Sequence, residues 1–155
     1  MEQEKLNSFS KYFADAFQKL TRNITGLKFT KSIQPIPLDG KKFLAIVGVA
    51  GMNRGRILVE INEKLAEKMF EITNDTSPED EDELFFYLAE FANVIGGNGL
   101  TSINNAYRGI ELRLTPPVVF AGENLEFNTT RIQSTSMFYH EEHGMIRIEI
   151  GFEGV

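Results

Sequence analysis

The sequence predicts an α+β domain in which long helices pack on one face of a largely antiparallel sheet. Two stretches, residues 7–26 and 77–109, place apolar side chains at helical spacing. Strand-like segments lie between them and after the second, and several neighbouring segments are joined by turns too short for a crossover helix. This element order favours a layer of helices over an antiparallel sheet.

Composition fits one soluble globular domain that covers residues 1–155. Of the 155 residues, 42% are hydrophobic and 25% are charged, which allows a real core. The net charge of −6 and the lack of a basic stripe argue against a nucleic-acid surface. Because no cysteine is present, disulfides and thiol chemistry are excluded. The polar N-terminus and the short longest apolar run, 43–51, lead us to expect a cytoplasmic protein without a membrane span.

In the first half of the chain we expect a helix, three strands and a second helix. Their ranges are 7–26, 28–36, 43–49, 56–61 and 62–73. Asn7 or Ser8 can cap the first helix and Gly26 can end it, and its aromatic stripe is typical of a core face. Residues 50–55 have the composition of a hairpin turn. Asn62 can cap the second helix.

The second half is expected to hold the long helix and about four strands. The strand ranges are 110–115, 118–120, 131–139 and 145–152. The last two form a hairpin. In its final strand isoleucines alternate with polar or small residues, which indicates one buried face.

The long helix, residues 77–109, is expected to start at Ser77 and Pro78, an N-cap and first-turn signal followed by acidic residues. Its apolar stripe contains Leu84, Leu88, Phe91 and Ile95. The run 96–99 holds glycines that each cost about 1 kcal/mol in a helix interior, yet the stripe continues beyond it. We favour one continuous helix whose small residues let another backbone approach. A helix, a glycine turn and a second short helix is the alternative.

Three side chains lie opposite the apolar stripe of the long helix. At about 100° per residue, Phe86, Glu90 and Asn93 share this outer face. Glu90 and Asn93 are one turn apart, so they can enter a partner together. The same Glu-x-x-Asn pattern also occurs at residues 4–7 and 71–74, so it is weak alone. An ordinary solvated face with one exposed aromatic is the alternative.

Other motifs give little support for chemistry within the chain itself. His140 and His143 flank two glutamates, but they are expected at a hairpin tip without a third ligand nearby. The glycines and arginines of residues 51–56 match no phosphate-binding fingerprint, and no serine lies in a G-x-S-x-G context. We therefore expect no metal or cofactor site here, and Glu90 and Asn93 would act inside a partner's active site.

A proline extends the pattern of the outer-face pair, because Pro116 follows Asn93 by 23 residues. In this arrangement the chain resembles the CheC/CheX/FliY family of chemotaxis phosphatases, and within it the single-site CheX branch. The likeness runs through the segments ITGLKF, GVAGMNRGRILVEI and LRLTPPVVFAGEN. It implies a CheC-like or CheX-like fold.

The resemblance implies a phosphatase that acts on the aspartyl phosphate of a CheY-like response-regulator receiver domain. It further implies that Asn93 holds and orients the attacking water, and that Glu90 pairs with the receiver's invariant lysine. Mg²⁺ is expected on the receiver, and no cofactor in this chain. The CheX branch forms homodimers through sheet-edge pairing and strand exchange, so we expect a homodimer.

Phe86 departs from the family, which commonly has Asp or Ser four residues before the glutamate. An exposed aromatic there suits a hydrophobic contact with the receiver. Phe86 and Gly97 are therefore candidate partner-binding residues. Two alternatives remain, a non-catalytic adaptor that binds receivers or flagellar and chemoreceptor components through this face, and a chain whose only role is to dimerise.

Overall fold

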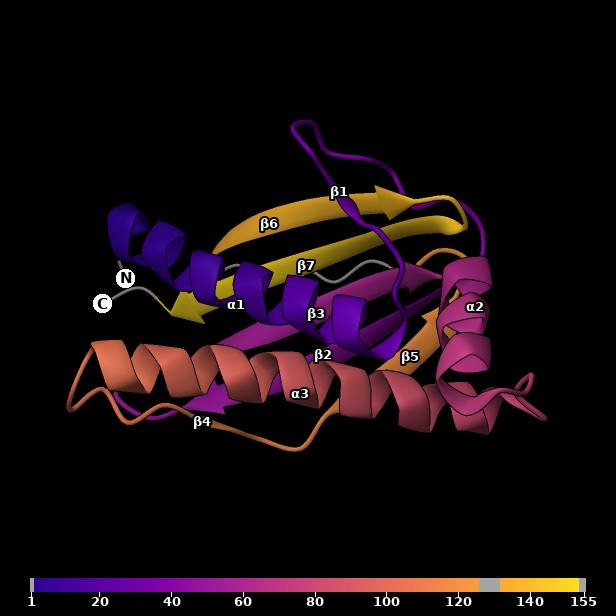
Figure 1. The fold of residues 1–155 in the computed structure, drawn as a ribbon. Helices are drawn as coiled ribbons and strands as arrows, with labels where there is room; N and C mark the ends of the chain where they lie inside the picture. Colours follow the sequence, from indigo (N-terminus) through magenta and orange to yellow (C-terminus); the bar gives the residue numbers. More distant parts are fainter. Residues whose placement is uncertain (1, 126–131, 154–155) are drawn as a thin grey trace.

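A layer of helices and a seven-stranded sheet make up the computed structural model, which describes residues 2–125 and 132–153. The helices are α1 (Gln3–Ile24), α2 (Glu63–Asn74) and α3 (Glu81–Ala106). The strands are β1 (Thr30–Ser32), β2 (Lys42–Ala50), β3 (Gly55–Asn62), β4 (Arg113–Leu114), β5 (Val118–Gly122), β6 (Ile132–Glu141) and β7 (Gly144–Glu153). α1 and α3 lie side by side over one face of the sheet, and α2 lies at one end of it (Figure 1). The expected α+β class is confirmed.

Every described strand pair is antiparallel, and the strand order is β1-β6-β7-β3-β2-β4, with β5 also paired to β2. Both expected hairpins, β2–β3 and β6–β7, are present, and β7 pairs with β3 to join them. β4 and β5 share the second edge of β2. Among the described strands, β5 therefore has one unpaired edge.

The aromatic stripe of α1 lies in the core, as its spacing predicts. Phe9, Phe13 and Phe17 are fully buried between α1, α3 and the sheet. Phe17 packs against Tyr139 of β6 and edge-on against Phe91 of α3, with ring centroids 4.5 and 6.3 Å apart. Aromatic packing of this kind stabilises the contact between the helix layer and the sheet.

α1 begins at Gln3, before both expected caps, because fully buried Leu6 extends the apolar stripe toward the N-terminus. Asn7 lies inside the helix and accepts a hydrogen bond from Gln3 Nε2 at 2.9 Å. Asn62 is the N-cap of α2, as predicted, but its side chain makes no capping bond. Its Oδ1 instead accepts from the N–H of Met145 in β7.

Two expected strands are shorter than predicted. The segment 28–36 contributes only β1, since the backbone leaves the sheet before Pro35 and Pro37, which have no N–H for a ladder. The segment 110–115 contributes only β4, because Glu111 has a left-handed backbone with φ of 49°. The strand expected over 131–139 is β6, and its first expected residue lies outside the described part of the chain.

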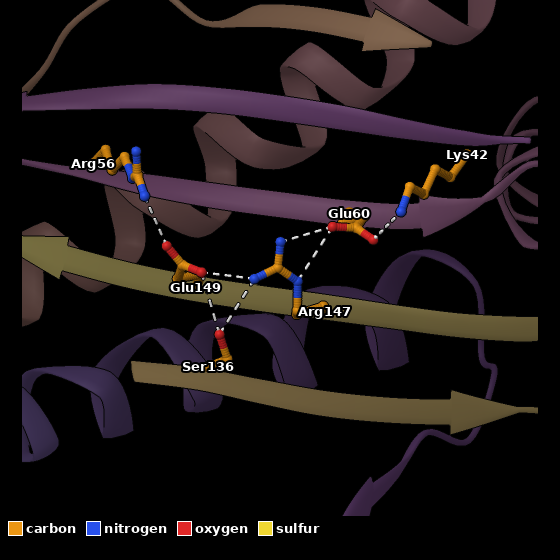
Figure 2. A network of polar contacts seen from close by, with 6 residues as sticks. All are labelled: Lys42, Arg56, Glu60, Ser136, Arg147 and Glu149. Carbon is orange, nitrogen blue, oxygen red and sulfur yellow. Dashed lines mark hydrogen bonds and ion pairs between the residues drawn. The ribbon is translucent and has the colours of Figure 1, made fainter. Parts of the chain in front are cut away.

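The face of the sheet opposite the helices carries a network of charged side chains (Figure 2). Arg147 of β7 donates to Glu60 of β3 at 2.7 Å and to Glu149 at 2.6 Å. Lys42 pairs with Glu60, and Arg56 pairs with Glu149, both at 3.0 Å. Burial alone would lower the pKa of Arg147, but the two carboxylates outweigh it and raise that pKa, so the guanidinium stays charged.

None of the described helices is long and apolar enough to cross a lipid bilayer.

Candidate functional site

Side-chain bonds fix where α3 begins. Asp80 is the N-cap, and its carboxylate accepts from the backbone N–H of Glu83 at 3.0 Å. The Glu83 carboxylate accepts from the N–H of Glu79 at 2.7 Å. The expected start at Ser77 is wrong, because the Ser77 hydroxyl instead donates to Glu71 of α2, at 3.2 Å.

The glycine run does not interrupt α3, so the continuous helix is confirmed and the two-helix alternative is wrong. A Cβ at Gly96 would lie 3.1 Å from Ile57 of β3 and 3.2 Å from Leu114. A Cβ at Gly99 would lie 2.4 Å from the ring of Phe13 in α1. The small residues are therefore required where α1 and the segment after α3 approach closely. The helix ends at Ala106, before the glycine expected to cap it.

The outer face of α3 presents the four residues that the sequence singled out. Phe86 is 77% exposed, Glu90 is exposed, and Asn93 and Gly97 are half-buried. Within the described residues, the side chains of Glu90 and Asn93 make no hydrogen bond or ion pair. A Cβ at Gly97 would meet no atom within 4 Å. A carboxylate and a carboxamide with free polar atoms are thus available to another molecule.

The two other Glu-x-x-Asn patterns differ from this pair in their hydrogen bonds. Asn7 accepts from Gln3 Nε2 at 2.9 Å, and Asn74 donates to the carbonyl of Phe70 at 3.1 Å. Each of these two amides therefore bonds within its own helix. Asn93 has no such bond to the described part of the chain.

An open hollow of about 430 Å³ lies beside the pair. It is lined by Glu90, Asn93, Val94, Leu114, Thr115 and Pro116. The first three belong to α3, and the last three belong to the segment that returns from the end of α3 toward β5 (Figure 1). The fold thus brings Pro116 to the same hollow as Glu90 and Asn93.

The two histidines lie apart from this hollow, near the turn between β6 and β7. His143 Nδ1 is 2.8 Å from Glu141 Oε1, and His140 is exposed opposite Thr30 of β1. Across residues 2–125 and 132–153, no three His, Asp or Glu side chains gather closely enough to hold a metal ion. The glycine and arginine residues near position 54 lie at the turn of the β2–β3 hairpin, as predicted.

Sequence reasoning missed Asn104, which lies on the same side of α3 as Asn93. Its Nδ2 donates to the carbonyl of Leu112 at 2.8 Å, and its Oδ1 accepts from the N–H of Leu112 at 2.9 Å. A helical wheel shows the angle of Asn104 but gives no sign that a later segment covers it. Only the path of the chain after α3 reveals this contact.

A family model described as chemotaxis phosphatase CheX matches residues 43–140, a range that contains Glu90, Asn93 and Pro116. A search of curated proteins finds no match. Among solved structures, the chain is similar to CheX from Vibrio vulnificus, with 20% identity and a TM-score of 0.82 over 94% of this chain and 96% of that chain. It is similar to CheX from Desulfovibrio desulfuricans, with 17% identity and a TM-score of 0.81 over 94% and 99%. It is also similar to a chain of the CheX–CheY–BeF3–Mg²⁺ complex from Borrelia burgdorferi, with 20% identity and a TM-score of 0.77 over 94% and 98%.

Proposed function

Because the chain belongs to the CheX family of chemotaxis phosphatases, we propose that it hydrolyses the aspartyl phosphate of a CheY-like receiver domain. The observation that carries the proposal is the outward pair Glu90 and Asn93, whose polar atoms are unpaired among the described residues and stand beside an open hollow. The Borrelia burgdorferi complex joins a CheX to a CheY with BeF3 and Mg²⁺. It supports a receiver of this kind as the partner.

In the proposed reaction water attacks phosphorus, the bond from phosphorus to the aspartyl oxygen breaks, and inorganic phosphate and a free carboxylate leave. Asn93 holds and orients the water, since a carboxamide can both donate and accept a hydrogen bond without taking a proton. An acyl phosphate beside Mg²⁺ is already activated, so placing water in line is the missing contribution and can be worth several kcal/mol. The receiver supplies Mg²⁺, and this chain supplies no cofactor.

Glu90, Phe86 and Gly97 supply the contacts that hold the receiver in this proposal. The exposed Glu90 carboxylate pairs with the receiver's lysine, which aligns Asn93 with the phosphoryl group. Phe86 lies one turn before Glu90 and offers an apolar contact. Gly97 lies one turn after Asn93, where no side chain keeps a partner's backbone away.

Replacement of Asn93 tests the proposed function. We expect Asn93→Ala to lower the rate of phosphate release from a phosphorylated receiver by about a hundredfold or more, because water positioning is lost. Binding of the receiver should largely persist, since Glu90 and Phe86 remain. Phosphate release and affinity for a beryllofluoride-loaded receiver are measured on the same preparations.

Asn98→Ala is the matched control, because Asn98 is an exposed asparagine on α3 away from the hollow. Its phosphate release should equal that of the unmodified chain. Equal activity of Asn93→Ala and Asn98→Ala would contradict the role of Asn93.

A non-catalytic adaptor is the second candidate function, and Phe86 is the observation that favours it. Its side chain is 77% exposed on the outer face of α3, where it offers an apolar surface to a partner and has no group for catalysis. An adaptor would bind receivers through α3 without speeding phosphate release. The same two measurements on the unmodified chain separate the two functions.

A further inference from the structure

The return segment, residues 110–116, runs back along α3 and forms the second wall of the hollow. Three pairs of neighbours show its course from the end of α3 toward its middle. Asn104 bonds to Leu112, Gly96 lies close to Leu114, and Asn93 lines the same hollow as Pro116. Its middle part, Arg113–Leu114, is the extended strand β4, which pairs with β2.

Asn104 bonds both backbone polar groups of Leu112, at 2.8 and 2.9 Å. The residue before Leu112 is Glu111, whose left-handed backbone, with φ of 49°, is unfavourable for a residue with a side chain. The carbonyl of Ile110 accepts from the N–H of Met52 at 3.2 Å, so the strained residue is held on both sides. Asn104 supplies the bonds on the side that leads to the hollow.

The far end of the return segment is fixed to the sheet. The N–H of Thr115 donates to the carbonyl of Gly48 at 2.8 Å, and Leu114 pairs with Val49 of β2. The return segment is thus held at two places, by Asn104 at Leu112 and by β2 at Leu114 and Thr115, and loss of the first leaves only the second.

We propose that Asn104 is a positioning residue for the proposed reaction. By holding Leu112 it secures one end of the segment that carries Leu114, Thr115 and Pro116, the wall against which the receiver docks. The inference rests on the proposed function. Asn104 touches no reacting atom, so it acts on docking and leaves the chemical step to Asn93.

Steady-state kinetics on a phosphorylated receiver test this role through Asn104→Ala and Asn104→Asp. We expect Asn104→Ala to raise KM about tenfold with kcat unchanged within about twofold, because two bonds to the wall are lost. Asn104→Asp keeps an acceptor for the Leu112 N–H but places a carboxylate oxygen against the Leu112 carbonyl, so its KM should rise at least as much as that of Asn104→Ala. Affinity for a beryllofluoride-loaded receiver, measured by calorimetry, should fall in the same order.

Asn105→Ala is the control, because Asn105 is the exposed neighbour of Asn104 on α3. All variants are assayed at a temperature where circular dichroism shows them folded. The inference is overturned if the KM of Asn104→Ala equals that of Asn105→Ala, or if only kcat falls, as a loss of folded protein would produce. If the unmodified chain does not speed phosphate release, both the proposed function and this inference are wrong. If the unmodified chain is active but Asn104→Ala has an unchanged KM, only this inference is wrong.

Discussion

Phe86 leaves 77% of its surface in solvent one helical turn from Glu90. We expect Phe86→Asp to weaken affinity for a phosphorylated receiver at least about tenfold, because burying a large apolar side chain contributes about 1.5–3 kcal/mol. Calorimetric titration of the receiver measures the change. The stability of the chain should hardly alter, since the ring makes little contact with the fold.

Ile33→Asp is the control for this charge change, because Ile33 is 97% exposed in the loop after β1. Its receiver affinity should stay at the level of the unmodified chain. An unchanged affinity in Phe86→Asp would mean that this aromatic does not contact the receiver.

Burial raises the pKa of Tyr139 to about 12, and the nearby charge of Asp15 adds to the shift. The unfolded chain therefore loses the phenol proton near pH 10, before the folded chain does. This contribution to stability is fully present below pH 10 and is lost as pH rises toward 12, with a loss of about 1 kcal/mol between pH 9 and pH 11. Tyr139→Phe should remove this part of the pH dependence.

Urea unfolding of both proteins at several pH values measures the effect as a difference. Tyr87, whose pKa is also raised by burial, is present in both, so its contribution cancels. If the free energies of unfolding of the two proteins change equally between pH 9 and pH 11, then folding does not raise the pKa of Tyr139.

At the scale of one element, two glycines in α3 should respond in opposite ways to alanine. Gly97→Ala places its Cβ in open space, so we expect a gain of up to about 1 kcal/mol from helix propensity. Gly99→Ala places its Cβ 2.4 Å from the ring of Phe13, and we expect a loss of about 1–3 kcal/mol from overpacking. Denaturant unfolding measures the free energy of unfolding of both variants. Each variant is the control for the other, because both replace a glycine of α3 with alanine.

Receiver affinity adds a second readout for the Gly97 variant. If a partner's backbone approaches α3 at Gly97, the added methyl group should weaken binding although the helix becomes more stable. Stability changes of the same sign in Gly97→Ala and Gly99→Ala would contradict the packing described for this helix.

The order of the elements could be predicted because apolar spacing reflects which side chains enter the core. Helix starts could not be predicted as well. Polar residues able to cap are common before both long helices, and packing elsewhere selects among them. Buried Leu6 moves the start of α1 before Asn7, and the hydrogen bond that Asp80 accepts from the N–H of Glu83 moves the start of α3 beyond Ser77.

The face of the candidate site was also predictable, since Glu90 and Asn93 lie opposite a strong apolar stripe and the structure leaves them outward. The path of the return segment could not be predicted from the sequence. Its path depends on the left-handed backbone of Glu111 and on the contact of Asn104 with Leu112, and neither leaves a periodic signal in the sequence. Long-range contacts of this kind appear only once the fold is known.

At the scale of the whole molecule, the sheet face opposite the helices has two parts. Buried charged pairs cover β3 and β7, where Arg147 joins Glu60 to Glu149 and so links neighbouring strands (Figure 2). On β5 the side chains of that face are apolar, and Val118 and Phe120 are 51% and 46% exposed. The charged part hinders association there, and the apolar part beside an unpaired strand edge favours it.

We propose that two copies of this chain associate through β5. Edge pairing between two copies would satisfy the backbone groups of β5 and bury Phe120. Light scattering should therefore give twice the chain mass of 17.5 kDa at micromolar concentration. Phe120→Lys should give the mass of one chain, while Ile33→Lys, the control at another exposed apolar residue, should remain dimeric.

The same variant shows whether the dimer and the α3 site depend on each other. Val118 and Phe120 pair with Ile46 and Leu44 of β2, whose side chains point away from the helices, whereas Glu90 lies on the helix layer. Phe120 is not among the residues that line the hollow, so Phe120→Lys should keep full phosphate release per chain. A monomeric unmodified chain, or a dimer that survives Phe120→Lys, would contradict pairing through this strand. Loss of activity on dissociation would mean that the second copy contributes to the site.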